Sequence, residues 1–160
     1  MNARKILVPT DFSTLGKTAL DTATVLARDQ GATLLLVHVQ EPSLAYGGGE
    51  FYYGTGEPDH GDLQRMLKEV VPGDPAVAYE HHLITGTPAE AVVDLAETEG
   101  ADMIVLATHG RTGLSRLLMG SVAEAIVRKA KCPVLTIKAA TTQQEVNSVN
   151  SGKHSMAGNK

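Results

Sequence analysis

The sequence predicts a doubly wound α/β fold, in which a five-stranded parallel sheet carries helices on both faces. Short apolar runs typical of strands alternate with stretches of helical periodicity over most of the chain. The run Leu34–Val37 has no polar residue at alternate positions, which favours a strand buried on both faces of a parallel sheet. Repeated strand–helix alternation also implies right-handed crossovers, which put helices on both faces.

The first three elements follow from local pattern alone. Arg4–Pro9 is predicted as a strand because its apolar centre is ended by proline. A helix is then expected from Ser13 to a stop at Gly31. Its apolar residues fall on one stripe, formed by Leu15, Ala19, Ala23, Leu26 and Ala27. The second strand is expected over Thr33–Val39.

The middle of the chain changes character. Pro42–Gly61 holds six glycines and two prolines, a composition that indicates a long loop. A short helix is expected over about Asp62–Val71. A third strand is predicted over Val77–Ile84.

Two further helices have the same start signal. Thr87–Glu90 and Ser121–Glu124 both match the capping box, in which a Ser or Thr N-cap is followed three residues later by Glu. Proline at the first helical position strengthens the earlier start. The two helices are expected to end near Gly100 and Ala130.

The last two strands complete the domain. They are predicted over Asp102–Ala107 and Pro133–Lys138. After residue 140 the composition changes to Thr, Gln, Asn, Ser, Gly and Lys, which cannot bury enough apolar surface to offset the entropy of ordering. We therefore expect one domain over 1–140 and a disordered tail over 141–160.

Composition and charge narrow the class of protein. The 160 residues are 42% hydrophobic and carry a net charge of −4, so no basic surface for nucleic acid is indicated. No apolar run approaches the length of a membrane span, and the start of the chain lacks a secretory signal pattern. The single cysteine, Cys132, cannot form an internal disulfide. These features predict a soluble cytoplasmic protein.

Two polar segments follow strands at the carboxyl edge of the predicted sheet, where open parallel sheets bind ligands. They are residues 9–13 and 108–121, and the second is rich in glycines that allow close backbone approach. Gly120 and Ser121 stand at a helix N-terminus, whose N–H groups and dipole favour an anion such as phosphate. A simpler interpretation stays open, in which the glycines form turns and Ser121 only caps its helix.

Other catalytic and nucleotide signatures are missing from the sequence. There is no P-loop, no GxGxxG after the first strand and no GxSxG elbow. Asp11 has no acidic neighbours of the kind that hold a divalent cation in a receiver domain. His81 and His82 are adjacent in a predicted strand and should point to opposite faces. We therefore predict neither a catalytic residue nor a metal ligand.

Residues 107–124 and 131–135, together with 8–13, resemble the signature segments of the universal stress protein (UspA) family, and the resemblance covers residues 4–138. Its ATP-binding branch has the pattern GxxG, nine residues, then G and Ser or Thr. Gly110, Gly120 and Ser121 match this pattern, whereas Ala107 replaces its first glycine. The Ala107 Cβ would obstruct the site if the backbone there needs positive φ or touches the ribose.

The resemblance implies an adenine nucleotide alpha hydrolase-like fold and ten binding residues for ATP, accompanied by Mg²⁺ held through phosphate oxygens and water. Asp11 would bond to the ribose or adenine, and Val39 would offer its backbone to the adenine edge. The residues implied at the adenosine end are Pro9, Thr10, Asp11, Val39, Leu106 and Ala107. Those implied at the phosphates are Gly110, Gly120, Ser121 and Val122.

Three functions are compatible with this sequence. The first is an ATP-dependent regulator that acts through a protein partner, which the sequence does not identify. The second is a nucleotide-free dimeric scaffold for stress responses, and the third is a slow ATPase. Under the first two, the protein is not an enzyme. The resemblance and the apolar edge position of the strand Pro133–Lys138 both predict a homodimer through that strand.

Overall fold

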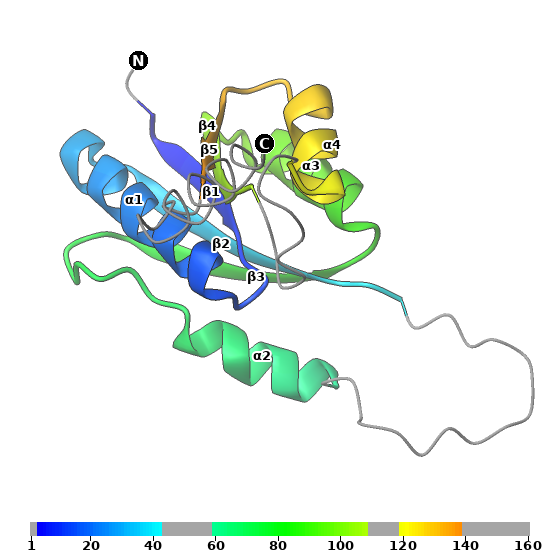
Figure 1. The fold of residues 1–160 in the computed structure, drawn as a ribbon. Helices are drawn as coiled ribbons and strands as arrows, with labels where there is room; N and C mark the ends of the chain where they lie inside the picture. The colour runs from blue at the N-terminus through cyan, green and yellow to red at the C-terminus, as the bar shows by residue number, and fades with distance from the viewer. Residues whose placement is uncertain (1–2, 43–58, 109–118, 139–160) are drawn as a thin grey trace, which may run out of the picture.

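The predicted sheet is confirmed by a computed structural model, which describes residues 3–42, 59–108 and 119–138. Five parallel strands lie in the order β3-β2-β1-β4-β5 (Figure 1). The first three strands are added toward one edge of the sheet, and β4 and β5 are then added on the other side of β1. Most of the predicted loops over 42–61 and 108–121, and the predicted tail over 141–160, lie outside the described residues, although His60 and Gly61 belong to a helix. The strands are β1 (Lys5–Pro9), β2 (Thr33–Gln40), β3 (Tyr79–Thr85), β4 (Met103–Ala107) and β5 (Val134–Ile137).

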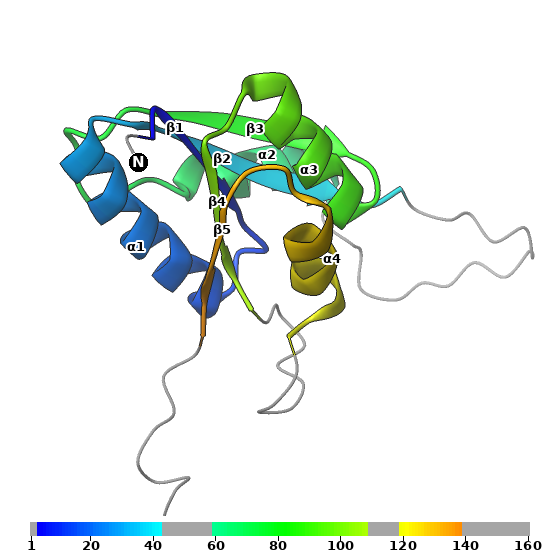
Figure 2. The same cartoon turned by 90° about the horizontal axis from the view of Figure 1, so that it is seen from above.

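Helices cover both faces of this sheet. Helix α1 lies on one face, and α3 and α4 lie on the other (Figure 2). Helix α2 contacts β2 and β3, and Val70, directly after it, packs into the core beneath α1. The helices are α1 (Thr14–Gln30), α2 (His60–Glu69), α3 (Pro88–Glu99) and α4 (Ser121–Lys129). Among the described residues, no helix has both the length and the apolar character that crossing a membrane requires.

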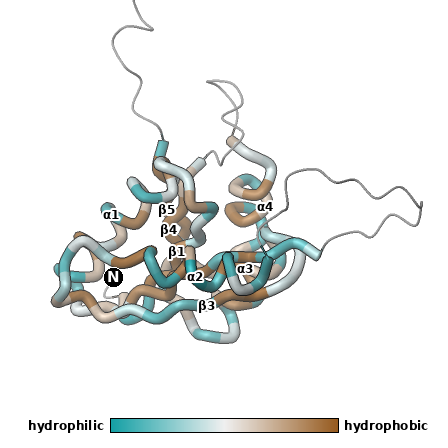
Figure 3. Tube along the Cα trace, turned by 90° about the horizontal axis from the view of Figure 1, so that it is seen from below, coloured by the Kyte–Doolittle hydropathy of each residue, from teal (hydrophilic) through white to brown (hydrophobic). Residues whose placement is uncertain are grey.

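The core consists of two apolar layers separated by the sheet. Side chains alternate along β1, so that Ile6 and Val8 join the layer beneath α1 while Leu7 joins the layer beneath α3 and α4. All three are essentially inaccessible to solvent. The inner strands β1 and β4 are mostly hydrophobic (Figure 3), as expected for strands covered on both faces.

Both predicted capping boxes are wrong in detail. Thr87 is the N-cap of α3, but its side chain makes no cap hydrogen bond, and Glu90 instead pairs with Lys129 of α4 at 3.0 Å. Ser121 is the first residue of α4 rather than its N-cap, which is Gly120. A carboxylate within reach of a lysine or arginine on the surface can prefer that partner to a neighbouring backbone N–H, and sequence spacing does not distinguish the two.

Other boundaries moved by one or two residues. Helix α2 begins at His60, two residues before the predicted start. The reason is that Asp59 caps the helix, because its side chain accepts a hydrogen bond from the Asp62 N–H. Strand β3 begins at Tyr79 rather than Val77. Val77 is nevertheless buried, so its apolar side chain belongs to the core without pairing in the sheet.

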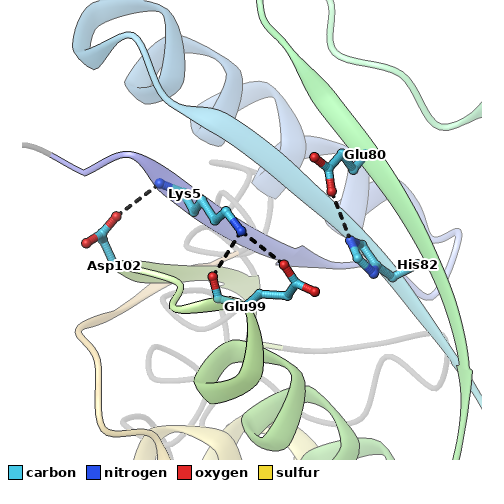
Figure 4. Close-up of polar contacts among 5 residues, drawn as sticks. All are labelled: Lys5, Glu80, His82, Glu99 and Asp102. Atoms are coloured by element: carbon cyan, nitrogen blue, oxygen red, sulfur yellow. Dashed lines mark hydrogen bonds and ion pairs between the residues drawn. The ribbon is translucent and has the colours of Figure 1, made fainter.

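Charged side chains form hydrogen bonds and an ion pair at the amino ends of β1 and β4. From these contacts we expect the stability of the fold to depend on pH. The Asp102 carboxylate accepts hydrogen bonds from the backbone N–H groups of Arg4 and Lys5 at 2.8 and 3.0 Å, and Lys5 Nζ pairs with Glu99 (Figure 4). The hydrogen bonds from Arg4 and then Lys5 hold the pKa of Asp102 below its ordinary value of 3.8. The stability that Asp102 contributes is therefore present above that value and is lost as pH falls through the lower folded-state pKa.

We expect Asp102→Asn to lower the free energy of unfolding at pH 7 by about 1 kcal/mol, because a neutral amide accepts these bonds less strongly at a partly exposed site. The difference between variant and parent should shrink on acidification through pH 4 to pH 2, where the parent carboxylate becomes protonated. Urea denaturation across this range measures both effects. Asp94→Asn, at an exposed position of α3, is the control, and equal stability of Asp102→Asn and parent at pH 7 would contradict the assignment.

Candidate functional site

A cavity of about 830 Å³ opens at the carboxyl ends of β1, β2 and β4. Its walls come from the loop after β1, the end of β2, the end of β4 and the first turn of α4. Every site residue implied by the sequence lies in this wall except Gly110, which falls outside the described residues. The lining includes Pro9, Thr10, Asp11, Val39, Leu106, Ala107, Gly120, Ser121 and Val122.

Strand β2 extends past the end of β1 and offers backbone groups to the cavity. The register pairs Pro9, the last residue of β1, with Val37, whereas β2 continues to Gln40. Peptide groups along a parallel strand point alternately to its two neighbours. Because Thr10 N–H donates to Val37 O at 2.8 Å, the peptide groups of Val39 also point to the β1 side, beyond the point where β1 ends.

Strand β4 also offers backbone groups to the cavity, from the side opposite β2. The Thr108 N–H donates to Ile137 O of β5 at 2.9 Å, so the peptide groups of the preceding residue, Ala107, point toward β1. Pro9 has no N–H to continue the pairing of β1 with β4. The cavity therefore has backbone peptide groups on two opposite sides. These groups can form hydrogen bonds with the edge of a planar polar ring.

The loop after β1 is organised by short-range hydrogen bonds. Asp11 Oδ1 accepts from Ser13 N–H at 3.0 Å, and Ser13 Oγ accepts from Gly16 N–H at 3.1 Å to cap α1. The second carboxylate oxygen, Asp11 Oδ2, is buried and has no hydrogen-bond partner among the described residues. A buried acceptor of this kind costs free energy unless a ligand or water supplies a donor.

The start of α4 has no side-chain cap within the described part of the chain. The N-cap Gly120 donates its N–H to Thr108 O at 2.7 Å, which brings the two ends of the intervening loop together. Glu124, the last residue of the predicted capping box, instead pairs with Arg128. Helices α1 and α2, by contrast, are capped by Ser13 and Asp59. The first turn of α4 thus keeps donors and a positive dipole end for an anion.

The sequence missed a second group of lining residues, at the end of β2 and the start of α2. His38, Gln40, Asp59 and His60 all border the cavity, and His60 Nδ1 lies 3.0 Å from Gln40 Oε1. His38 is half-buried, and its Nδ1 lies 2.8 Å from the Thr10 carbonyl oxygen. For His38 and Gln40, the position at the carboxyl end of a predicted strand was the available signal, whereas Asp59 and His60 follow a long loop and carried no such signal.

The histidines of β3 and the single cysteine do not form a catalytic or metal-binding site within residues 3–42, 59–108 and 119–138. No three His, Cys, Asp or Glu side chains in these segments come together as metal ligands. His81 bonds to the Val70 carbonyl and His82 lies beside Glu80, on opposite faces of β3 as predicted. Burial raises the pKa of the Cys132 thiol, which disfavours the nucleophilic thiolate.

Comparison with protein families identifies the domain. The model of the family described as the universal stress protein family matches residues 2–138. A universal stress protein of Methanocaldococcus jannaschii, MJ0531, is 32% identical over 140 residues, which cover 84% of this chain and 82% of that protein.

Solved structures show the same fold. The structure of protein MJ0577 of the same archaeon has a TM-score of 0.68 and 26% identity, and the match covers 89% of this chain and all of that one. A universal stress protein from Archaeoglobus fulgidus, determined in complex with dAMP, has a TM-score of 0.62 and 27% identity. That match covers 86% of this chain and 100% of the other.

Proposed function

This chain belongs to the universal stress protein family, and from that premise we propose that it binds ATP in the cavity between the loop after β1 and the start of α4. The observation that carries the proposal is the presence, in one cavity, of a buried carboxylate oxygen and a helix N-terminus that both lack a side-chain partner among the described residues. The first can accept from a ribose hydroxyl or an adenine amino group. The second can donate to phosphate oxygens.

The proposed pose follows from the two ends of the cavity. Adenine would lie over the end of β1, between the peptide groups of Val39 and Ala107, with Asp11 beside it. The phosphates would point to Gly120 and Ser121 at the first turn of α4. A bound adenine nucleotide in the Archaeoglobus relative supports the same class of ligand for this chain.

The alanine that replaces the first motif glycine adds no backbone strain at that position. Ala107 is the last residue of β4, and Phe12 is the one non-glycine residue with positive φ in the described part of the chain. The backbone at Ala107 therefore needs no conformation reserved for glycine. Mg²⁺ would accompany ATP through phosphate oxygens and water, since the described residues offer no cluster of three ligating side chains.

We propose that nucleotide occupancy changes the surface offered to a protein partner, so that the protein regulates rather than catalyses. A nucleotide-free dimeric scaffold and a slow ATPase are the alternatives. Denaturing the purified protein and chromatographing the released nucleotide separates them. Released ATP supports the regulator, ADP with continuing turnover supports the ATPase, and a clean protein that also fails to bind added ATP supports the scaffold.

Asp11 gives a sharp test of the adenosine end. Asp11→Asn preserves an oxygen for the Ser13 N–H but replaces the Oδ2 acceptor with an NH₂ donor, so we expect it to weaken ATP binding by about 1 to 3 kcal/mol. Asp11→Ala should weaken binding to a similar extent. Isothermal titration calorimetry gives the affinities, with Asp21→Ala on the exposed side of α1 as the control. Binding of ATP by Asp11→Asn with the parent affinity would show that Oδ2 does not face the ligand.

A further inference from the structure

The His38 ring links β2 to the loop that carries Asp11. Its Nδ1 lies 2.8 Å from the carbonyl oxygen of Thr10. A carbonyl oxygen only accepts, so Nδ1 must carry the proton and donate. The same ring contacts the Phe12 ring, with 4.4 Å between the ring centroids and 35° between their planes. His38 therefore contacts the residues on both sides of Asp11.

The peptide groups of Thr10 are held by β2 at both ends. The Thr10 N–H donates to Val37 O at 2.8 Å, and the Thr10 carbonyl accepts from His38. Two residues later, Phe12 has a φ of +63°, a conformation that costs free energy for a residue with a bulky side chain. Its N–H bonds to Thr10 Oγ1 at 3.1 Å. The conformation of the loop thus depends on contacts with its neighbours.

We infer that His38 is a positioning residue that sets the direction of the Asp11 carboxylate by fixing the Thr10 carbonyl. The inference rests on the proposed ATP site, because Asp11 is placed there at the adenosine end. Asp11 Oδ1 is engaged by Ser13 N–H and Oδ2 is left without a partner among the described residues, so a small rotation of the loop redirects the free oxygen. His38 also lines the cavity, and the experiment must separate positioning from direct contact.

Two substitutions separate the hydrogen bond from the ring. His38→Asn places an amide nitrogen at the position of Nδ1 and removes the ring, whereas His38→Phe keeps a ring against Phe12 and removes the donor. We expect His38→Phe to weaken ATP binding about tenfold, and His38→Asn to stay within about threefold of the parent. His38→Leu, which also lacks the donor, repeats the test if the phenylalanine variant does not fold.

A double-mutant cycle with Asp11→Ala distinguishes positioning from contact. If His38 acts through Asp11, His38→Phe should cause no further loss of ATP affinity once Asp11 is alanine. An equal loss in both backgrounds would overturn the inference, because it would mean that His38 touches the ligand or supports the fold generally. Unchanged affinity in His38→Phe alone would overturn it as well.

Amide hydrogen exchange in the nucleotide-free protein tests the inference independently of ATP. The Ser13 N–H, which bonds to Asp11 Oδ1, should exchange at least about tenfold faster in His38→Phe and close to the parent rate in His38→Asn. If the parent fails to bind ATP, the proposed function fails while this measurement still decides the role of His38. Unchanged exchange in His38→Phe would refute that role even if ATP binds.

Discussion

Replacing Gly120 with Val should abolish measurable ATP binding while leaving the fold intact. The backbone of Gly120 has φ −60° and ψ 149°, an extended conformation that any residue adopts, so the substitution adds no backbone strain. What it adds is a branched side chain at the cavity wall, where phosphates would approach the donors of the first turn of α4. We expect an affinity loss of at least about a hundredfold by calorimetry.

Gly73→Val is the matched control for this experiment. Gly73 is exposed, and a Cβ added there meets no atom within 4 Å, so the variant should bind ATP like the parent. Thermal unfolding should show similar midpoints for the parent and both variants. If Gly120→Val binds ATP within threefold of the parent, the phosphates do not lie against α4, and the nucleotide-free scaffold becomes the better account.

Replacing Leu135 with Lys should convert a homodimer into monomers. Strand β5 lies at the edge of the sheet and pairs with β4 on one side, so among the described residues its other side has no strand partner. Leu135 is 37% exposed on this strand. We propose that two copies of β5 pair antiparallel across a two-fold axis, an arrangement that brings two Leu135 side chains into one interface.

Sedimentation at tens of micromolar, where an interface of modest affinity still holds, measures the change. Leu135→Lys is a cleaner test than a substitution of Ile137, because Ile137 packs against the core beneath α1 and its loss would destabilise the monomer. Tyr79→Lys, at an exposed position of β3 on the opposite edge, is the control. A parent that sediments as a monomer refutes the dimer, and dissociation by Tyr79→Lys alone would place the interface at β3.

Much of this fold could be predicted because its signals are local. Apolar runs such as Leu34–Val37 identified the strands, and Gly31 and Gly100 ended helices where positive φ angles of 65° and 64° are observed. The alternation of elements then limited the topology to a parallel sheet with a crevice beside its first strand. The residues around Pro9 and Gly120 were placed at that crevice from the sequence, and the structure brings them to one cavity.

The sequence by itself determined where strands and helices lie, because periodicity, proline and glycine act within a few residues of one another. The tertiary structure decided which polar groups pair. Glu90 and Glu124 had the spacing of capping boxes, yet Lys129 and Arg128 offered full charges within reach. It also decided that His38 holds the Thr10 carbonyl, a contact between residues 28 positions apart that exists only once β1 and β2 pair. Such contacts depend on the register of distant strands, which no local pattern specifies.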